Sequence, residues 1–382
     1  MFGFGKLRSY LGIDLGAGGV KLVELRNEKK RAVLHTYGFT ESAQDIHQLL
    51  FKQEAAEENV GLRPIEQKPA TAPVILVDQS KITAYASIIR AVCDEAKVQS
   101  KIAVASLPVS TVFHAIVTLP MVKREEFDRI MRAEIKKLLP YPLEDMVIDS
   151  QVLPDVSETK TQRVLVNAVP RAIVVFYTKV FQEAGLTLES LEPESIALAR
   201  SLVGKDKATQ VIVDIGAERT NFFIVDQAVP VTHHSIERGG DKMNAILAAT
   251  LGLEPGKTTE QLKHDVFSYL MAHPNETAIK KEQFLIVFNS IIEPILKEIE
   301  YSLELYLRQS ANQDKRPEKV ILTGGSALLP YLAEHISEKF KMKCYIGDPW
   351  GRVVYQNGLR PILQAIAPRM SVAIGLALRN VL

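Results

Sequence analysis

Two distant stretches of the chain share one pattern of hydrophobic and polar positions. Residues 11–25 read as an apolar strand, a glycine-rich turn and a second apolar strand, and residues 211–226 repeat this order. In each stretch the first strand ends in Asp-x-Gly, at Asp14 and at Asp214, which lie 214 − 14 = 200 positions apart. This separation favours one hairpin in each of two related lobes over a short tandem repeat. We therefore expect a ligand cleft between the lobes.

The remaining pattern alternates helices with short strands, which is typical of an α/β protein. We expect a buried strand over 102–107 and a strand over 320–324 that ends in a double glycine before a helix from Tyr331. Helical periodicity predicts further helices over residues 81–96, 174–184, 284–309 and 371–382.

A compact strand-helix-strand-strand unit interrupts this alternation. Its strands are expected over 112–119, 147–152 and 163–168, and its helix over 123–139 carries apolar residues on one face. Because a chain of 382 residues is too long for one ordinary core, we expect several parts. The predicted parts are a first lobe at 1–108 and 164–203, the inserted subdomain at 109–163, a second lobe at 204–360, and a C-terminal helix at 361–382 that returns to the first lobe.

Composition excludes several classes of protein. A formal net charge of +1 offers no overall attraction for nucleic acid or anionic lipid, so no nucleic-acid partner is expected. The two cysteines, Cys93 and Cys344, lack the spacing of a zinc site or a disulfide framework, which fits a reducing cytoplasm. No uninterrupted apolar run reaches about 18 residues, so we do not expect a membrane-spanning helix.

The turn of the first hairpin is suited to holding an anion. Gly16, Ala17, Gly18 and Gly19 can turn backbone N–H groups toward a phosphate chain with few Cβ atoms in the way. Lys21 follows the turn and can add a positive charge. An ordinary glycine hairpin explains the same residues, so the segment alone leaves both interpretations open.

Carboxylates at the ends of two facing strands form a candidate magnesium site. Asp14 and Asp214 are expected to bind hydrated Mg²⁺ through its waters, although either can instead be a turn residue that bonds its own backbone. Thr220 can offer a hydroxyl to the γ-phosphate, and Glu192 is the candidate catalytic residue that orients the attacking water. Glu194 is better explained as a charge that complements the start of a helix.

The order of these motifs resembles the superfamily of actin, sugar kinases and DnaK-type chaperones. The resemblance implies an actin-like ATPase fold, built from duplicated ribonuclease H-like lobes that bind ATP and Mg²⁺. The matching segments are the first phosphate motif Asp14-Leu15-Gly16 with Lys21, the connecting motif Glu192-Pro193, the second phosphate motif Asp214-Ile215-Gly216 with Thr220, the adenosine motif Gly324-Gly325-Ser326, and Ala373-x-Gly375.

Within this superfamily the chain is similar to the PilM family of type IV pilus assembly proteins, which carries an FtsA-like inserted subdomain. The similarity includes residues 20–25, 138–144, 214–220, 239–241 and 375–379. It implies a cytoplasmic scaffold at the inner face of the inner membrane, held there by partners. Those partners are the N-terminal cytoplasmic tail of a PilN-like protein and pilus motor ATPases.

The resemblance also implies further nucleotide contacts. Gly239 and Gly240 are expected near the phosphates, with a structural turn as the alternative, and Lys297 and Glu298 near the adenosine. Ala17 and Gly18 stand where relatives often have serines, so we expect ATP binding with slow or absent hydrolysis.

Two other functions remain open. An FtsA-like division protein shares the cleft and the inserted subdomain, but it carries an amphipathic membrane-targeting tail that we do not find after the last helix. A small-molecule kinase of the same superfamily needs a catalytic base that faces an acceptor hydroxyl, and no Asp segment clearly provides one.

Overall fold

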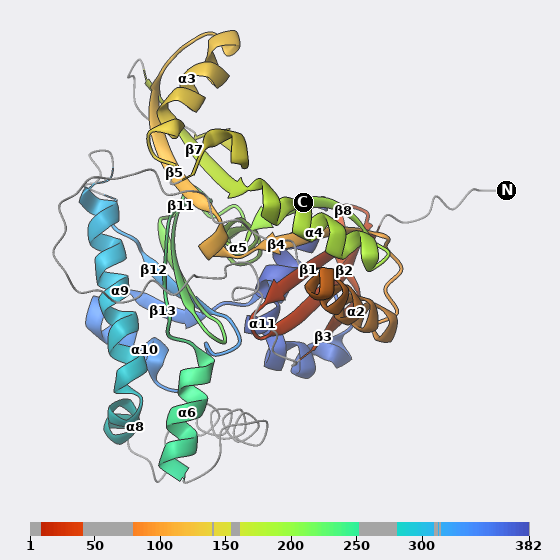
Figure 1. Cartoon of the computed structure of the whole chain (residues 1–382). Helices are drawn as coiled ribbons and strands as arrows, with labels where there is room; N and C mark the ends of the chain where they lie inside the picture. The colour runs from red at the N-terminus through yellow and green to blue at the C-terminus, as the bar shows by residue number, and fades with distance from the viewer. Residues whose placement is uncertain are drawn as a thin grey trace, which may run out of the picture. The chain divides into compact units, whose positions relative to one another are not determined.

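A computed structural model describes residues 9–40, 79–139, 141–153, 161–251, 281–308, 312 and 315–381. The chain divides into two compact units (Figure 1). The described residues within Met1–Gln44, Val92–Val109 and Glu189–Leu382 form the first unit. Those within Asp45–Ala91 and Ser110–Leu188 form the second unit, which therefore takes in more of the chain than the predicted insertion.

The first unit contains two five-stranded sheets with the same topology. In one, the strand order is β3-β2-β1-β4-β8, with β1 antiparallel to β2 and parallel to β4. In the other, the order is β11-β10-β9-β12-β13, with β9 antiparallel to β10 and parallel to β12. This repeat is the duplication expected from the two hairpins. The strands are β1 Ser9–Gly16, β2 Gly19–Glu28, β3 Arg31–Phe39, β4 Ile102–Leu107, β8 Thr187–Pro193, β9 Gln210–Ile215, β10 Thr220–Asp226, β11 Val229–Ile236, β12 Lys319–Thr323 and β13 Lys343–Ile346.

The second unit holds a three-stranded antiparallel sheet in the order β5-β7-β6. Its elements are β5 Phe113–Pro120, α3 Arg124–Lys136, β6 Met146–Val152 and β7 Thr161–Pro170, which confirms the expected order of strand, helix, strand and strand. α3 buries Met131 and Ile135 against Leu119 and Val164 of the sheet. The predicted apolar face of this helix is therefore core.

The other helices agree with the predicted ones except at two places. The expected helix over 284–309 is two helices, α8 and α9, separated by a turn at residue 288. The expected helix over 371–382 begins eleven residues earlier, at Arg360, because Pro361 occupies a first-turn position and Pro368 is tolerated inside the helix. The helices are α2 Gln79–Glu95, α4 Arg171–Glu183, α5 Glu194–Leu198 with a π-helical turn at Ala199–Val203, α6 Gly240–Leu251, α8 Lys281–Val287, α9 Asn289–Arg308, α10 Leu332–Phe340 and α11 Arg360–Leu378.

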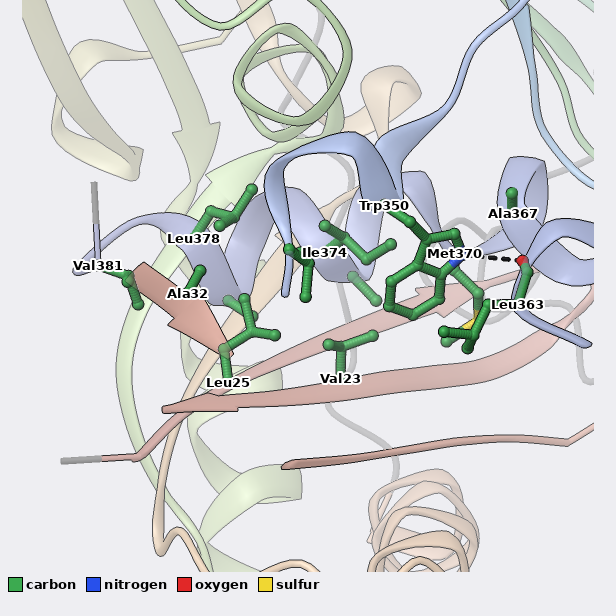
Figure 2. Packing of buried hydrophobic residues seen from close by; sticks show 13 residues of the cluster. Val23, Leu25, Ala32, Trp350, Leu363, Ala367, Met370, Ile374, Leu378 and Val381 are labelled. Carbon is green, nitrogen blue, oxygen red and sulfur yellow. Dashed lines mark hydrogen bonds between the residues drawn. The ribbon is translucent and has the colours of Figure 1, made fainter. Parts of the chain in front are cut away.

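Helix α11 packs on the first sheet and forms its main core. Figure 2 shows Met370, Ile374 and Leu378 facing Val23 and Leu25 of β2. In the same cluster the buried ring of the single tryptophan, Trp350, donates a hydrogen bond from Nε1 to the carbonyl of Leu363 at 2.9 Å (Figure 2). By length and composition alone, residues 357–378 are apolar enough for a membrane span, but 67% of the most apolar window of this stretch is buried inside the protein. Burial against a sheet explains this composition.

A second cluster of apolar residues joins the two sheets within the first unit. It combines Val104 of β4, Leu198 of α5, Phe223 of β10, Ile321 of β12 and Leu376 of α11. α5 and α11 thus lie at the junction of the two sheets, and the ends of β1 and β9 are positioned relative to each other by this shared core.

Candidate nucleotide site

The first hairpin places Asp14 at the end of β1 with its carboxylate almost fully buried. The Ser106 hydroxyl donates to Asp14 Oδ1 at 2.8 Å and accepts from the backbone N–H of Leu15 at 3.3 Å. Lys21 Nζ lies 3.9 Å from Asp14 Oδ2 and donates to the Gly19 carbonyl at 3.0 Å. Gly19 has φ +102°, a conformation that favours glycine and closes the turn. A positive charge therefore stands directly over the predicted anion-binding turn.

The second hairpin meets the first at their turns. A Cβ added at Gly18 would lie 3.3 Å from the Cβ of Ala217, so the two turns face each other at van der Waals distance. The Gly216 N–H donates to the carbonyl of Arg219 at 2.9 Å and closes the second turn. The structure thus brings together the two Asp-ended strands that the sequence placed 200 positions apart.

The two aspartates affect each other electrostatically. Burial, and then the negative charge of Asp14, raise the pKa of Asp214 from 3.8 to about 6, while Asn221 and Lys21 oppose the shift. Two mutually repelling carboxylates in a buried site gain from a shared cation. Mg²⁺ keeps most of its waters and needs few protein oxygens, so this pair fits a hydrated Mg²⁺. Among the described residues no group of three or more His, Cys, Asp or Glu side chains encloses a metal ion by itself.

The predicted adenosine motif packs against the second hairpin. Gly324 has φ +90°, and a Cβ there would lie 2.5 Å from Asp214 Oδ1, so only glycine fits this close approach. The Gly324 N–H donates to the carbonyl of Pro368 at 3.1 Å, and the Ser326 N–H donates to that of Ile215 at 3.0 Å. These two amides hold the loop in place beside Asp214. We call the pair of Asp14 and Asp214 the acidic site.

Gly239 and Gly240 lie directly against the second turn. The Gly240 N–H donates to the Gly216 carbonyl at 2.9 Å, and a Cβ at Gly239 would lie 2.7 Å from the carbonyl carbon of Ala217. The Thr220 hydroxyl is fully buried and donates to the carbonyl of Arg238 at 2.5 Å. The close contact explains Gly239 as a packing position, the hydrogen bond ties Gly240 to the second turn, and the Thr220 proton is committed to the backbone.

The two glutamates of the connecting segment lie in different surroundings. Both oxygens of Glu192 are held by Arg200, at 2.8 and 3.1 Å, and Oε1 also lies 3.1 Å from Nε of Arg379. Glu194 is buried, and its pKa is raised well above the usual value by desolvation, by Asp14 and by Asp214. The charges of both aspartates therefore act on Glu194, whereas the carboxylate of Glu192 is occupied by ion pairs.

The two predicted adenosine contacts on α9 differ in exposure. Lys297 is exposed, whereas Glu298 is largely buried and lies 2.8 Å from Nε2 of His234 on β11. The described contact thus ties Glu298 to the edge strand of the second sheet. A role of either residue toward adenosine stays a prediction.

Sequence reasoning missed Ser106 and gave Glu194 only a structural role. Ser106 is the penultimate residue of the apolar strand of residues 102–107, and a lone polar residue near the carboxyl end of a buried parallel strand was the available signal. Glu194 had no such signal, because its approach to Asp14 and Asp214 depends on how α5 crosses the junction between the sheets.

The duplicated sheets, the facing Asp-ended hairpins and the inserted three-stranded unit define a protein of the actin-like ATPase fold. The family model described as type IV pilus assembly protein PilM matches residues 42–381, and the chain belongs to this family. The predicted fold class and family are thereby confirmed. The match begins after the first hairpin, so the place of Asp14 in the site rests on the structure.

Known proteins with similar sequence or structure agree with this fold. The solved PilM-PilN type IV pilus biogenesis complex contains a chain with TM-score 0.73 and 21% identity, covering 98% of each chain. The ethanolamine utilization protein EutJ from Carboxydothermus hydrogenoformans gives TM-score 0.51 and 14% identity over 97% of this chain and 90% of its own. The cell division protein FtsA from Streptococcus pneumoniae is 24% identical over 200 residues, which cover 48% of this chain and only 42% of FtsA.

Proposed function

We propose that this protein is an ATP- and Mg²⁺-binding scaffold of type IV pilus assembly that receives the N-terminal cytoplasmic tail of a PilN-like inner-membrane protein. The observation that carries the nucleotide site is the meeting of the two hairpin turns at Gly18 and Ala217, with both aspartates at the strand ends beneath them. Membership of the PilM family supports the cellular role.

Each part of the site has a defined task in this proposal. The turn of Gly16 to Gly19 presents backbone N–H groups to the phosphates, and Lys21 neutralises part of their charge. Asp14 and Asp214 hold the waters of Mg²⁺, which when bound shields the phosphate charge. The loop of Gly324 to Ser326 packs beside Asp214 and forms the adenosine side.

We expect slow or absent hydrolysis because neither turn offers a free side-chain hydroxyl to the γ-phosphate. The first turn has Ala17 and Gly18, so it offers no side-chain hydroxyl, and the Thr220 hydroxyl donates its proton to a carbonyl. Glu192 was the predicted catalytic residue, but its carboxylate is held by two arginines. Glu194, which is buried and on which the charges of both aspartates act, is the better candidate to position a water that attacks the γ-phosphate.

The proposed partner is taken from a solved relative. The PilM-PilN complex has a chain with the fold of this protein, and in that complex PilM assembles with PilN. We assign the tail to the inserted unit, whose exposed apolar side chains include Met121, Leu138 and Val152, at 64, 51 and 50% exposure. Such a partner supports our proposal of a cytoplasmic scaffold at the inner face of the inner membrane. We further propose, from the resemblance alone, that pilus motor ATPases are also partners.

The nucleotide site is tested by titrating the full chain with a fluorescent ATP analogue, with Mg²⁺ and with EDTA. The double variant Asp14→Asn, Asp214→Asn keeps the side-chain size and removes the two charges. We expect it to lose about tenfold or more of the Mg²⁺-dependent affinity, since charge-assisted contacts are each worth about 1.5–3 kcal/mol. Asp206→Asn is the matched control, because Asp206 pairs with Lys319 on the exposed surface.

Equal Mg²⁺-dependent affinity in the double variant and the parent would contradict the metal assignment. The partner is tested separately by titrating the same protein with a synthetic peptide of the PilN-like tail. Absence of peptide binding, with nucleotide binding intact, would remove the scaffold part of the proposal and leave the nucleotide site standing.

A further inference from the structure

An ion cluster ties three elements together beside the candidate nucleotide site. Arg200, in the π-helical turn after α5, donates two hydrogen bonds to the carboxylate of Glu192 and a third, at 2.7 Å, to the Gly375 carbonyl of α11. Arg379, after α11, completes the cluster at 3.1 Å from Glu192 Oε1. We call these four residues the Glu192 clamp. Both oxygens of its single carboxylate are used, so Glu192 is committed to holding the clamp.

The clamp lies two residues from Glu194 along a stiff segment. Pro193 separates the two glutamates, and its ring restricts the backbone between the end of β8 and the start of α5. On the far side of this segment, the Val109 N–H donates to Glu194 Oε2 at 3.4 Å. A displacement of Glu192 therefore moves Glu194 relative to the acidic site.

The same helix also reaches the adenosine loop. The Pro368 carbonyl of α11 accepts hydrogen bonds from the Gly324 N–H at 3.1 Å and from the Thr323 hydroxyl at 3.2 Å. Seven residues along, α11 crosses α5 so closely that a Cβ at Gly375 would lie 2.5 Å from the carbonyl carbon of Ala197. One rigid helix thus contacts the adenosine loop, the α5 backbone and the clamp.

We propose that Arg200 and Arg379 are positioning residues of the nucleotide site: by holding Glu192 they keep Glu194 in its position at the Val109 N–H. This inference rests on the proposed function and assigns to Glu192 a part different from water activation. Arg200 fixes the crossing of α5 and α11 through the Gly375 carbonyl, and Arg379 fixes the carboxylate from the end of α11. Burial of the acidic site makes the position of Glu194 important, because electrostatic interactions there are weakly screened.

Because Arg379 is partly exposed, a variant at this residue can test the positioning of Glu192 without a large loss of stability. Its side chain is 36% exposed, and ion pairs near the surface contribute little to stability. Removing this arginine should therefore leave the protein folded while it loosens Glu192. Arg379→Gln removes the charge, Arg379→Lys keeps it, and Glu192→Gln removes the opposite charge of the same pair. Arg129→Gln, which breaks an exposed pair with Glu126 on α3, is the matched control.

The experiment combines hydrogen exchange without nucleotide and titration with Mg·ATP, both on the full chain. In Arg379→Gln and Glu192→Gln we expect faster exchange of the Val109 amide, which reports the position of Glu194, and no change in the central amides of β9. We expect both variants to weaken Mg·ATP binding about three- to fivefold, the range of a partly exposed ion pair. Arg379→Lys should restore most of the affinity, and Arg129→Gln should match the parent.

Unchanged Val109 exchange in both Gln variants would overturn the inference. Faster exchange with unaltered Mg·ATP affinity would also overturn it, because the clamp would then be merely structural. If the parent chain itself binds no Mg·ATP, the proposed nucleotide function fails, and Val109 exchange alone decides whether the clamp holds Glu194.

Discussion

The crossing of α5 and α11 at Gly375 makes one substitution especially informative. In Gly375→Ala, the added Cβ would lie 2.5 Å from the carbonyl carbon and 2.9 Å from the Cα of Ala197, both of which are backbone atoms. A backbone cannot rotate away as a flexible side chain can. On the opposite side, a Cβ at Gly12 of β1 would lie 2.5 Å from the Ala377 N–H nitrogen, so α11 has no room to retreat.

The expected cost exceeds that of an ordinary overpacked position. Inserting one methyl group into a packed core costs about 1–3 kcal/mol, and we expect Gly375→Ala to reach the upper end or more. Alanine favours the helix by about 1 kcal/mol over glycine, which offsets only part of this cost. Because about 1 kcal/mol shifts Tm by about 2–4 °C in domains of 150–250 residues, the melting temperature should fall by several degrees.

The single tryptophan provides the assay. Trp350 is 1% exposed in the cluster that α11 forms with the first sheet, so its fluorescence follows the unfolding of this part of the protein in urea or on heating. Gly358→Ala is the matched control, since a Cβ there meets no atom within 4 Å. A Gly375→Ala protein as stable as the Gly358→Ala protein would refute the close crossing and the packing derived from it.

Three further predictions concern other positions. Glu24→Ala removes the buried acceptor of two backbone N–H groups, at 2.9 and 3.0 Å, and should lower the free energy of unfolding by about 2 kcal/mol or more in urea titrations. A loss below about 0.5 kcal/mol, which is the level of a surface substitution, would contradict this burial. The raised pKa of Asp214 means that the folded state binds a proton more tightly than the unfolded state. Without Mg²⁺, stability should therefore fall as the pH rises from 3.8 through about 6, by on the order of 3 kcal/mol from this group. Asp214→Asn should remove that dependence, and an unchanged pH profile in Asp214→Asn would refute the assignment. Gly204→Ala should lower Tm for two reasons: Gly204 has φ +64°, and its added Cβ would overlap the Arg352 guanidinium. The double variant with Arg352→Ala should recover only the part of the Tm loss that the overlap causes, because the positive φ still disfavours alanine.

The sequence pattern predicted helices and strands correctly where the residues of the element itself determine its structure. The two hairpins, the strand at 102–107 and the β-α-β-β insertion all appear where periodicity predicts them. The predicted start of the last helix was wrong because two prolines, which usually break helices, lie inside it. Pro361 and Pro368 look like helix breakers, but α11 contains both. Pro361 lies in the first turn, where its missing N–H has no intrahelical bond to lose, and Pro368 lies inside the helix.

The sequence by itself determined the repeated Asp-x-Gly hairpins, and with them the α/β class, the duplication and the identity of the two candidate metal carboxylates. Only the tertiary structure decided on which glutamate of the connecting segment their charges act. Glu192 and Glu194 are two positions apart and have the same side-chain chemistry, and the local pattern favoured Glu192 because Glu194 begins a helix. Their surroundings differ because burial and partners come from distant segments: arginines at 200 and 379 surround Glu192, and aspartates at 14 and 214 act on Glu194.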